Sequence, residues 1–312
     1  MDILIDGNYE GMTIREVLTS KLGYSSNLIK KLKFSEGGIT VNGGFVTVRY
    51  VLRRGDLLSL GVEDKDSDVS PYTIPCDLPI EVIFEDEWVT AVNKPHDMPA
   101  HPSLGHKLDT VANALAYRYG DRPYVFRPVN RLDRDTSGCM LTANSKAASY
   151  KMYLAMTEGR IRKRYIAVLC GVPTVREGRI ETYMRRAEGS IIQREETAPD
   201  DPEGKIAITE YRVLFANDTY SVAEAYPITG RTHQLRVQFA GMGCPIVGDT
   251  LYGSESPHIG RHALHCIGTT FPHPEDGRTV NVTSSLPEDI RGLTEAVFGC
   301  VPDAFLCQKE QE

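Results

Sequence analysis

The chain has 312 residues, of which 41% are hydrophobic and 25% charged, and its net charge is −7. This composition is typical of a globular protein, and the length allows one large core plus a smaller module. No apolar run approaches the roughly 18 residues of a membrane helix, and the acidic start lacks a signal segment. Seven scattered cysteines without CxxC pairs favour free thiols. We therefore expect a cytoplasmic protein with no membrane partner.

The negative charge is confined to two segments. Residues 63–100 carry a net charge of −8 and residues 187–204 carry −5, which leaves +6 for the rest of the chain. Net acidity alone argues against a nucleic-acid partner. Because the acidic residues are segregated, a basic binding face elsewhere is compatible with this composition.

Residues 1–62 are predicted to form a small basic α/β domain. Apolar residues at helical spacing predict helices at residues 13–23, closed by Gly23 as a left-handed cap, and at residues 25–34. Alternating apolar residues around an Asn-Gly turn predict strands within residues 37–60.

This small domain is rich in cations, with eight Lys/Arg against two Glu between residues 15 and 54. Two short helices with a basic face and a small sheet resemble the RNA-binding domain first described in ribosomal protein S-four. We expect its second helix to bind RNA through Lys30, Lys31 and Lys33. The alternative is a lysine face that is merely solvated, since basic helices are common.

A charged linker closed by prolines is predicted at residues 63–75, then a large domain at 76–300 and a tail at 301–312. Mixed strands and helices without regular β-α alternation indicate an α+β fold. Polar residues 187–204 predict a loop. The expected elements of the large domain are two strands around the acidic turn 85–87, helices at 109–120 and 145–159, a central apolar strand at 164–172, and strands at 210–214 and 220–228.

The stretch VNRLDRDTSG, residues 129–138, packs two aspartates and two arginines into ten residues. It matches the start of a calcium loop, but Asn144 stands at the twelfth position, where that loop needs a bidentate glutamate. The calcium interpretation therefore fails. DTSG is also a good turn sequence, so we expect Asp135 or Thr136 to hydrogen-bond with nearby backbone.

A turn does not account for Asp133. The neighbouring Arg131 and Arg134 would lower the pKa of its carboxyl group and keep it ionised, as a nucleophile or ion-pair partner requires. A second polar segment at residues 227–249 contains a predicted helix with Arg236 beside its buried stripe. A buried arginine usually needs an anionic partner, and Asp133 is the predicted one.

Two further features of these segments have competing interpretations. Tyr165, in RKRYIAVLCG, would be a core residue on its own, but three preceding cations suit a tyrosine that stacks on a base. Arg231 and His233 belong to the same polar cluster as Arg236, but an exposed helix face after a glycine turn also accounts for them.

Four histidines and one cysteine near the C-terminus are candidates for a zinc site. Their spacing is irregular and no CxxC half accompanies them, so structural histidines on a strand are the better interpretation. The residues concerned are His258, His262, His265, Cys266 and His273.

Three motifs in order, RLDRDTSG, KRYIAVLCG and PITGRTHQLRVQFAGMGCPIVGDTLYG, resemble those of the RluA class of pseudouridine synthases, over about residues 75 to 275. The resemblance implies a catalytic domain with a central mixed or antiparallel sheet. It also implies isomerisation of specific uridines in structured ribosomal or transfer RNA to pseudouridine, without a cofactor or metal. We expect a monomer.

The resemblance also implies residue roles. Asp133 matches the catalytic aspartate, and Arg131 matches an arginine that helps to hold the flipped target nucleotide. Tyr165 matches the tyrosine that packs on the target base, and Arg236 the arginine that pairs with the catalytic carboxylate.

Two positions depart from the family pattern. Asn130 stands where histidine is usual, and Gln238 follows RV where histidine is usual. They keep open a rival hypothesis, a non-catalytic RNA-binding or ribosome-assembly protein on the same scaffold. A weaker rival is an aspartate-dependent nucleosidase, in which water captures the sugar.

Overall fold

The structure is a computed structural model that describes residues 1–22, 24, 26–35, 37–61, 68–121 and 123–301. The predicted cap at Gly23 lies outside these residues, as do the first part of the predicted linker and all of the predicted tail but Val301.

The N-terminal unit has its own four-stranded antiparallel sheet, in the order β1-β4-β2-β3. Asn42 and Gly43 both have positive φ, 50° and 78°, which confirms the predicted Asn-Gly hairpin. The first predicted helix is short and continues as a π-helix. The elements are β1 (Asp2–Leu4), α1 (Ile14–Glu16), the π-helix (Val17–Lys21), α2 (Ser26–Phe34), β2 (Ile39–Val41), β3 (Gly44–Phe45) and β4 (Leu57–Leu60).

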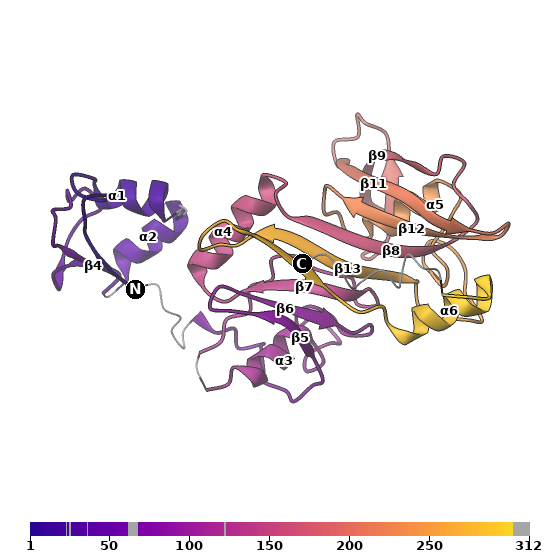
Figure 1. The fold of residues 1–312 in the computed structure, drawn as a ribbon, viewed down its shortest axis with the longest axis horizontal. Helices are drawn as coiled ribbons and strands as arrows, with labels where there is room; N and C mark the ends of the chain where they lie inside the picture. The colour runs from indigo at the N-terminus through magenta and orange to yellow at the C-terminus, as the bar shows by residue number, and fades with distance from the viewer. Residues whose placement is uncertain (23, 25, 36, 62–67, 122, 302–312) are drawn as a thin grey trace.

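The large unit is built on a ten-stranded mixed sheet, in the order β10-β9-β11-β12-β8-β13-β7-β6-β5, with β14 paired to β13. Neighbouring strands are antiparallel except β13 and β7, which are parallel. The α+β fold with a mixed sheet is therefore confirmed (Figure 1). The strands are β5 (Glu81–Glu85), β6 (Val89–Lys94), β7 (Ser137–Ala143), β8 (Arg162–Cys170), β9 (Glu177–Arg186), β10 (Arg194–Thr197), β11 (Lys205–Ala216), β12 (Tyr220–Pro227), β13 (Leu264–Pro272) and β14 (Thr279–Thr283).

Strand β8 lies between β12 and β13, which confirms the predicted central strand. The predicted polar loop at residues 187–204 is wrong in part, because it contains β10. This strand pairs only with β9, at the edge of the sheet, and none of its residues is buried. An edge strand of this kind carries no apolar alternation that a sequence pattern could reveal.

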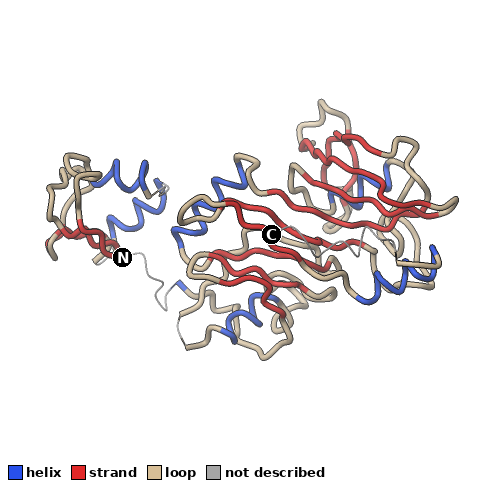
Figure 2. The backbone as a smooth tube through the Cα atoms, in the orientation of Figure 1, coloured by secondary structure: helices blue, strands red, loops and turns tan. Residues whose placement is uncertain are grey.

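Within the described residues, four helices pack around this sheet (Figure 2). They are α3 (Val111–Arg118), α4 (Lys146–Thr157), α5 (Gln234–Gly241) and α6 (Glu288–Phe298). The N-terminal unit lies at the α4 end, where Ala147 joins its apolar core. Every helix in the described part of the chain is too short or too polar to cross a bilayer.

Glycine is required where β7 meets β13. Gly138 has φ +111° and pairs with Cys266 across the parallel strands. A Cβ atom at this position would lie 2.2 Å from the Cys266 carbonyl oxygen. The TSG end of the aspartate motif therefore serves a close backbone approach as well as a turn.

Candidate active site

The four predicted substrate and catalytic residues line one cleft of about 960 Å³. Asp133 and Arg131 come from the turn before β7, Tyr165 from β8, and Arg236 from α5. Segments about a hundred residues apart in the chain therefore meet at this cleft.

Asp133 lies at the start of a turn that is closed by a hydrogen bond from the Thr136 N–H to the Asp133 carbonyl, at 3.1 Å. Its side chain is 27% exposed, so a substrate can reach the carboxylate. Arg236 Nη1 is 3.6 Å and His233 Nε2 4.0 Å from its Oδ2 atom. The predicted ion pair between Asp133 and Arg236 is present.

The shorter contacts of Arg236 go to Asp249. Its Nε and Nη2 atoms donate to the two carboxylate oxygens at 2.7 and 2.8 Å, and the Asp249 side chain is fully buried. Burial acts to lower the pKa of Arg236, but the hydrogen bonds to Asp249 outweigh it and raise that pKa. Burial likewise acts to raise the pKa of Asp249, and Arg236 lowers it overall. Asp249 was not predicted as a partner of Arg236, although it ends the polar segment 227–249.

Of the two flanking arginines, Arg134 pairs with carboxylates other than Asp133. This side chain pairs with Asp135 through Nε and Nη2, both at 3.0 Å, and lies 3.6 Å from Asp97. The carboxylate of Asp135 is thus in an ion pair and not in the predicted bond to turn backbone. Arg131 is exposed at the cleft.

A buried lysine holds the loop that carries the aspartate. Lys94 is fully buried and its Nζ donates to the carbonyl oxygens of Pro95, Met98 and Arg134, at 2.7 to 2.8 Å. Burial lowers the pKa of Lys94 to about 7. This contact ties the turn around Asp133 to the end of β6.

Arg261 supports the same turn from the other side. It forms a bidentate pair with Asp289 at 2.7 and 2.9 Å, and donates to the Asp135 carbonyl at 2.9 Å and to the Ser137 hydroxyl at 3.2 Å. The backbone of the aspartate motif is therefore fixed by side chains that the motif does not contain.

His233 is not on an exposed helix face, because its side chain is only 10% exposed. It precedes α5 in the left-handed conformation, with φ 58°. Its Nδ1 atom is 2.8 Å from the Tyr252 hydroxyl, which accepts a 2.8 Å hydrogen bond from the Arg194 N–H. Burial lowers the pKa of His233, although Asp133 opposes that shift.

Tyr165 is 7% exposed and belongs to the hydrophobic core, yet it lines the cleft. Both interpretations of this residue therefore fit the same position. Burial raises the pKa of its hydroxyl well above the usual value, so the tyrosine is neutral. Lys163, two residues earlier on β8, is also buried and lines the cleft.

The two departures from the family pattern make hydrogen bonds to the scaffold. Asn130 lines the cleft, accepts from the Leu141 N–H at 2.8 Å and donates to the Cys139 carbonyl at 3.4 Å. Gln238 is fully buried, and its amide joins α5 to β9 and β11. Both side chains thus hold backbone elements in place.

The candidate zinc histidines are dispersed. His262 Nε2 is 2.8 Å from the Thr136 hydroxyl, His265 Nδ1 is 2.9 Å from the Ser137 hydroxyl, and His273 pairs with Asp86. Only His265 of the histidines lies on β13, so their predicted position on a strand is wrong for the others. Among the described residues, no group of three or more His, Cys, Asp or Glu could hold a metal. Burial lowers the pKa of His262 to about 3, so it is neutral beside the aspartate motif.

The three predicted RNA-binding lysines lie on α2, away from the cleft. Lys30, Lys31 and Lys33 are all exposed. Lys31 is 3.2 Å from Asp68, which also pairs with Lys146 of α4. Part of this basic face therefore contacts the segment that leads into the large unit.

The site is thus a carboxylate held by a buried arginine in an open cleft, and the fold that carries it is a mixed α+β sheet. Residues 89–241 match the family described as RNA pseudouridylate synthase. The chain is 37% identical over 285 residues to the uncharacterized RNA pseudouridine synthase YjbO of Bacillus subtilis (strain 168), covering 90% of this chain and 98% of that relative. It is 33% identical over 234 residues to ribosomal large subunit pseudouridine synthase D of Zymomonas mobilis, covering 70% and 73%.

Solved structures show the same fold. Human RNA pseudouridylate synthase domain containing 1 matches with a TM-score of 0.55 and 28% identity, over 68% of this chain and 87% of that chain. The human domain containing 4 protein matches with a TM-score of 0.57 and 22% identity, over 69% and 92%, which supports the fold alone. The chain belongs to the RNA pseudouridine synthases, and the resemblance to their RluA class is confirmed.

Proposed function

We propose that this chain converts specific uridines of structured ribosomal or transfer RNA to pseudouridine with Asp133 as the essential residue and without a cofactor, as a cytoplasmic monomer. The observation that carries the proposal is the position of Asp133, reachable in the cleft and 3.6 Å from a buried arginine. An arginine at this distance places a positive charge beside the carboxylate and orients it in the cleft. The name of the Zymomonas mobilis relative favours ribosomal RNA among the candidates.

The reaction requires that the N1–C1′ bond breaks, the base rotates and C5 joins C1′. N1 gains a proton and C5 loses one, so the product is an isomer and no redox partner is needed. The Asp133 carboxylate can start the sequence by attacking the sugar or by taking a proton from it. Both routes need an ionised carboxylate within reach of the sugar.

The target base must leave its stack, which costs a few kcal/mol. We propose that Arg131, exposed at the cleft, holds the flipped state and that Tyr165 packs on the base. The burial of Tyr165 supports this role, because a rigid neutral ring offers a fixed apolar surface.

We further propose that the domain at residues 1–62 binds RNA through Lys30, Lys31 and Lys33 and does no chemistry. Exposure of these lysines supports binding, and their position outside the cleft supports the division of labour. Because Lys31 is paired with Asp68, we expect it to contribute less than the other two.

Asp133→Asn tests the proposal with almost no change in shape. The variant and the wild type are incubated with RNA from cells that lack the protein, and pseudouridine is mapped while free uracil is assayed. We expect new pseudouridine with the wild type and none with the variant. Asp135→Asn is the matched control and should stay active, since that carboxylate pairs with Arg134.

Substantial pseudouridine from Asp133→Asn would contradict the role of this residue. Free uracil from the wild type would instead support a nucleosidase, and neither product would support a non-catalytic binder. The map also identifies the RNA and the uridine.

A further inference from the structure

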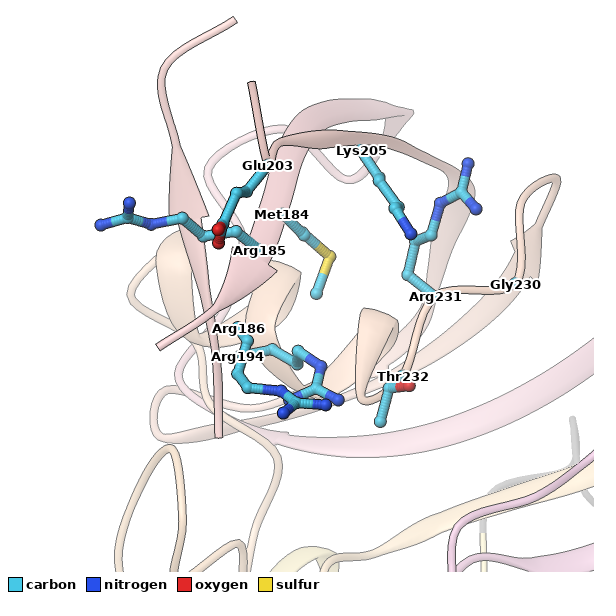
Figure 3. Close-up of a pocket in the computed structure, with 9 residues that line it drawn as sticks. All are labelled: Met184, Arg185, Arg186, Arg194, Glu203, Lys205, Gly230, Arg231 and Thr232. Carbon is cyan, nitrogen blue, oxygen red and sulfur yellow. The ribbon is translucent and has the colours of Figure 1, made fainter. Parts of the chain in front are cut away.

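A second cavity, of about 480 Å³, lies where the β9–β10 hairpin faces the loop before α5. The second cavity adjoins the candidate active-site cleft, because both are lined by Gly230, Arg231 and Thr232. Figure 3 shows the remaining lining side chains around the opening. They are Met184, Arg185, Arg186, Arg194, Glu203 and Lys205.

One wall of this cavity holds two arginines that face each other across the hairpin. Arg186 and Arg194 are directly opposite in the β9–β10 register, and their side chains extend side by side (Figure 3). Like charges at opposed positions destabilise an antiparallel pair. Among the described residues, neither arginine forms a salt bridge. An anion bound between them would remove the repulsion.

The adjoining pair in the same hairpin is charge-balanced. Arg185 is opposite Glu195, at 2.8 Å, and is also 3.1 Å from Asp201. In Figure 3 the Arg185 side chain extends away from the cavity. Because successive side chains of a strand point to opposite faces, the hairpin neutralises its outward arginine and leaves the inward two unneutralised.

The opposite wall adds two more cations, Lys205 of β11 and Arg231 (Figure 3). The Arg231 Nε atom donates to the Ile206 carbonyl at 2.9 Å, which fixes the guanidinium beside the cavity. Apart from the outward Arg185, the lining thus contains four Arg or Lys and a single carboxylate, Glu203. It has no aromatic ring for stacking, so its chemistry suits an anion and not a base.

This cavity is also connected to the catalytic carboxylate. The Arg194 N–H donates to the Tyr252 hydroxyl, which is 2.8 Å from His233, whose Nε2 atom is 4.0 Å from Asp133. Because the two cavities also share Gly230, Arg231 and Thr232, the cations lie beside the cleft that we propose for the target nucleotide.

We propose that Arg186, Arg194, Lys205 and Arg231 form a phosphate-binding subsite for the RNA backbone next to the target uridine. This inference rests on the proposed function. Planar guanidinium groups bind phosphate oxygens through paired hydrogen bonds, and the paired geometry of Arg186 and Arg194 suits one phosphodiester group.

The test compares the double variant Arg186→Gln/Arg194→Gln with a control that removes the same charge elsewhere. Arg179→Gln/Arg278→Gln is matched, because each of those arginines is exposed and already paired with a carboxylate. Affinity for the mapped substrate RNA is measured between 50 and 200 mM salt, the range over which phosphate contacts are most visible. Thermal melting verifies that both variants are folded.

We expect the subsite variant to bind roughly ten-fold more weakly than the control, as loss of charged hydrogen bonds to phosphate implies. Its salt slope should be shallower by about 0.7–0.9 log units per lost contact. The same RNA is then made with one neutral methylphosphonate at each linkage flanking the target. The wild type should lose affinity at one linkage, and the subsite variant should lose none there.

Equal affinities of the subsite and control variants would overturn the subsite. Weaker binding without dependence on any linkage would also overturn it, because the arginines would then attract RNA only generally. If the wild type forms no pseudouridine in the mapping experiment, the proposed function fails and this inference fails with it. Pseudouridine formation without linkage dependence refutes the subsite alone.

Discussion

Replacing Arg236 by leucine tests how Asp133, the proposed catalytic carboxylate, is held. The substitution removes the partner of two carboxylates that differ in burial. The side chain of Asp249 is fully buried, whereas that of Asp133 is 27% exposed and can be solvated. The stability cost should therefore come mainly from Asp249, and breaking such a buried pair costs about 3–5 kcal/mol in the free energy of unfolding.

The cost should depend on pH in a defined direction. In the wild type, Arg236 lowers the pKa of Asp249, so this pair stabilises the fold above the unfolded pKa of about 3.9, and that stability is lost as pH falls through the folded pKa. In Arg236→Leu, Asp249 keeps only the hydrogen bonds from the Leu251 and Tyr252 N–H groups, at 3.0 and 3.2 Å, and we expect burial then to raise its pKa. The variant then loses stability as pH rises from about 4 through that raised pKa.

Urea unfolding at pH 4.5 and pH 7 measures this difference, with pseudouridine formation measured in parallel. We expect a larger deficit at pH 7 and a severe loss of activity. Adding Asp249→Asn to Arg236→Leu should recover part of the stability, because the uncompensated charge is gone, but not the activity. A deficit below about 1 kcal/mol that is the same at both pH values would refute the buried-pair reasoning.

Two further predictions concern the stability of the scaffold, and a third concerns RNA binding by the N-terminal domain. Burial lowers the pKa of Lys94 to about 7, against roughly 10.4 in the unfolded chain. In urea titrations the wild type should therefore gain stability relative to Lys94→Met as pH rises from about 7 to about 10. A stability difference that stays constant over this pH range would contradict the prediction. Gly138→Ala should lower the melting temperature far more than Gly189→Ala. A Cβ atom at Gly189 meets nothing within 4 Å, so that control costs only about 1 kcal/mol. Equal effects would disprove the close approach of Gly138 to Cys266. Removing residues 1–70 should weaken RNA binding and flatten the salt dependence of log affinity by about 0.7–0.9 per lost phosphate contact. Single-turnover pseudouridine formation should persist at saturating RNA. Loss of this chemistry in a folded variant would show that the two domains share the active site.

Sequence patterns predicted the elements whose signals are local. The central strand β8 has an apolar run that burial on both sides requires, and the Asn42-Gly43 turn has the backbone preference of a tight hairpin. Strand β10 has no strand pattern in the sequence because its four residues are all charged or polar and pair with one neighbour only. The π-helical continuation of α1 also has no sequence signature that periodicity detects.

The candidate site divides in the same way. Asp133, Arg236 and Tyr165 stand in three recognisable motifs, and the structure brings them to one cleft. The supports of the aspartate turn could not be predicted, because their partners are distant in the chain. Lys94 contacts a carbonyl 40 residues away and Arg261 one that is 126 residues away.

The distribution of charge shows why net charge is a poor guide to the proposed RNA-binding surface. Residues 187–204 carry −5, yet Arg194 of this segment lines the second cavity beside Arg186. The acidic partners Glu195 and Asp201 are paired with Arg185 on the outward face of the hairpin. Strand alternation thus separates charges that a segment sum adds together, and short-range screening makes the local cations the relevant ones for a phosphate. An acidic chain can therefore present a cationic cavity beside its proposed catalytic carboxylate.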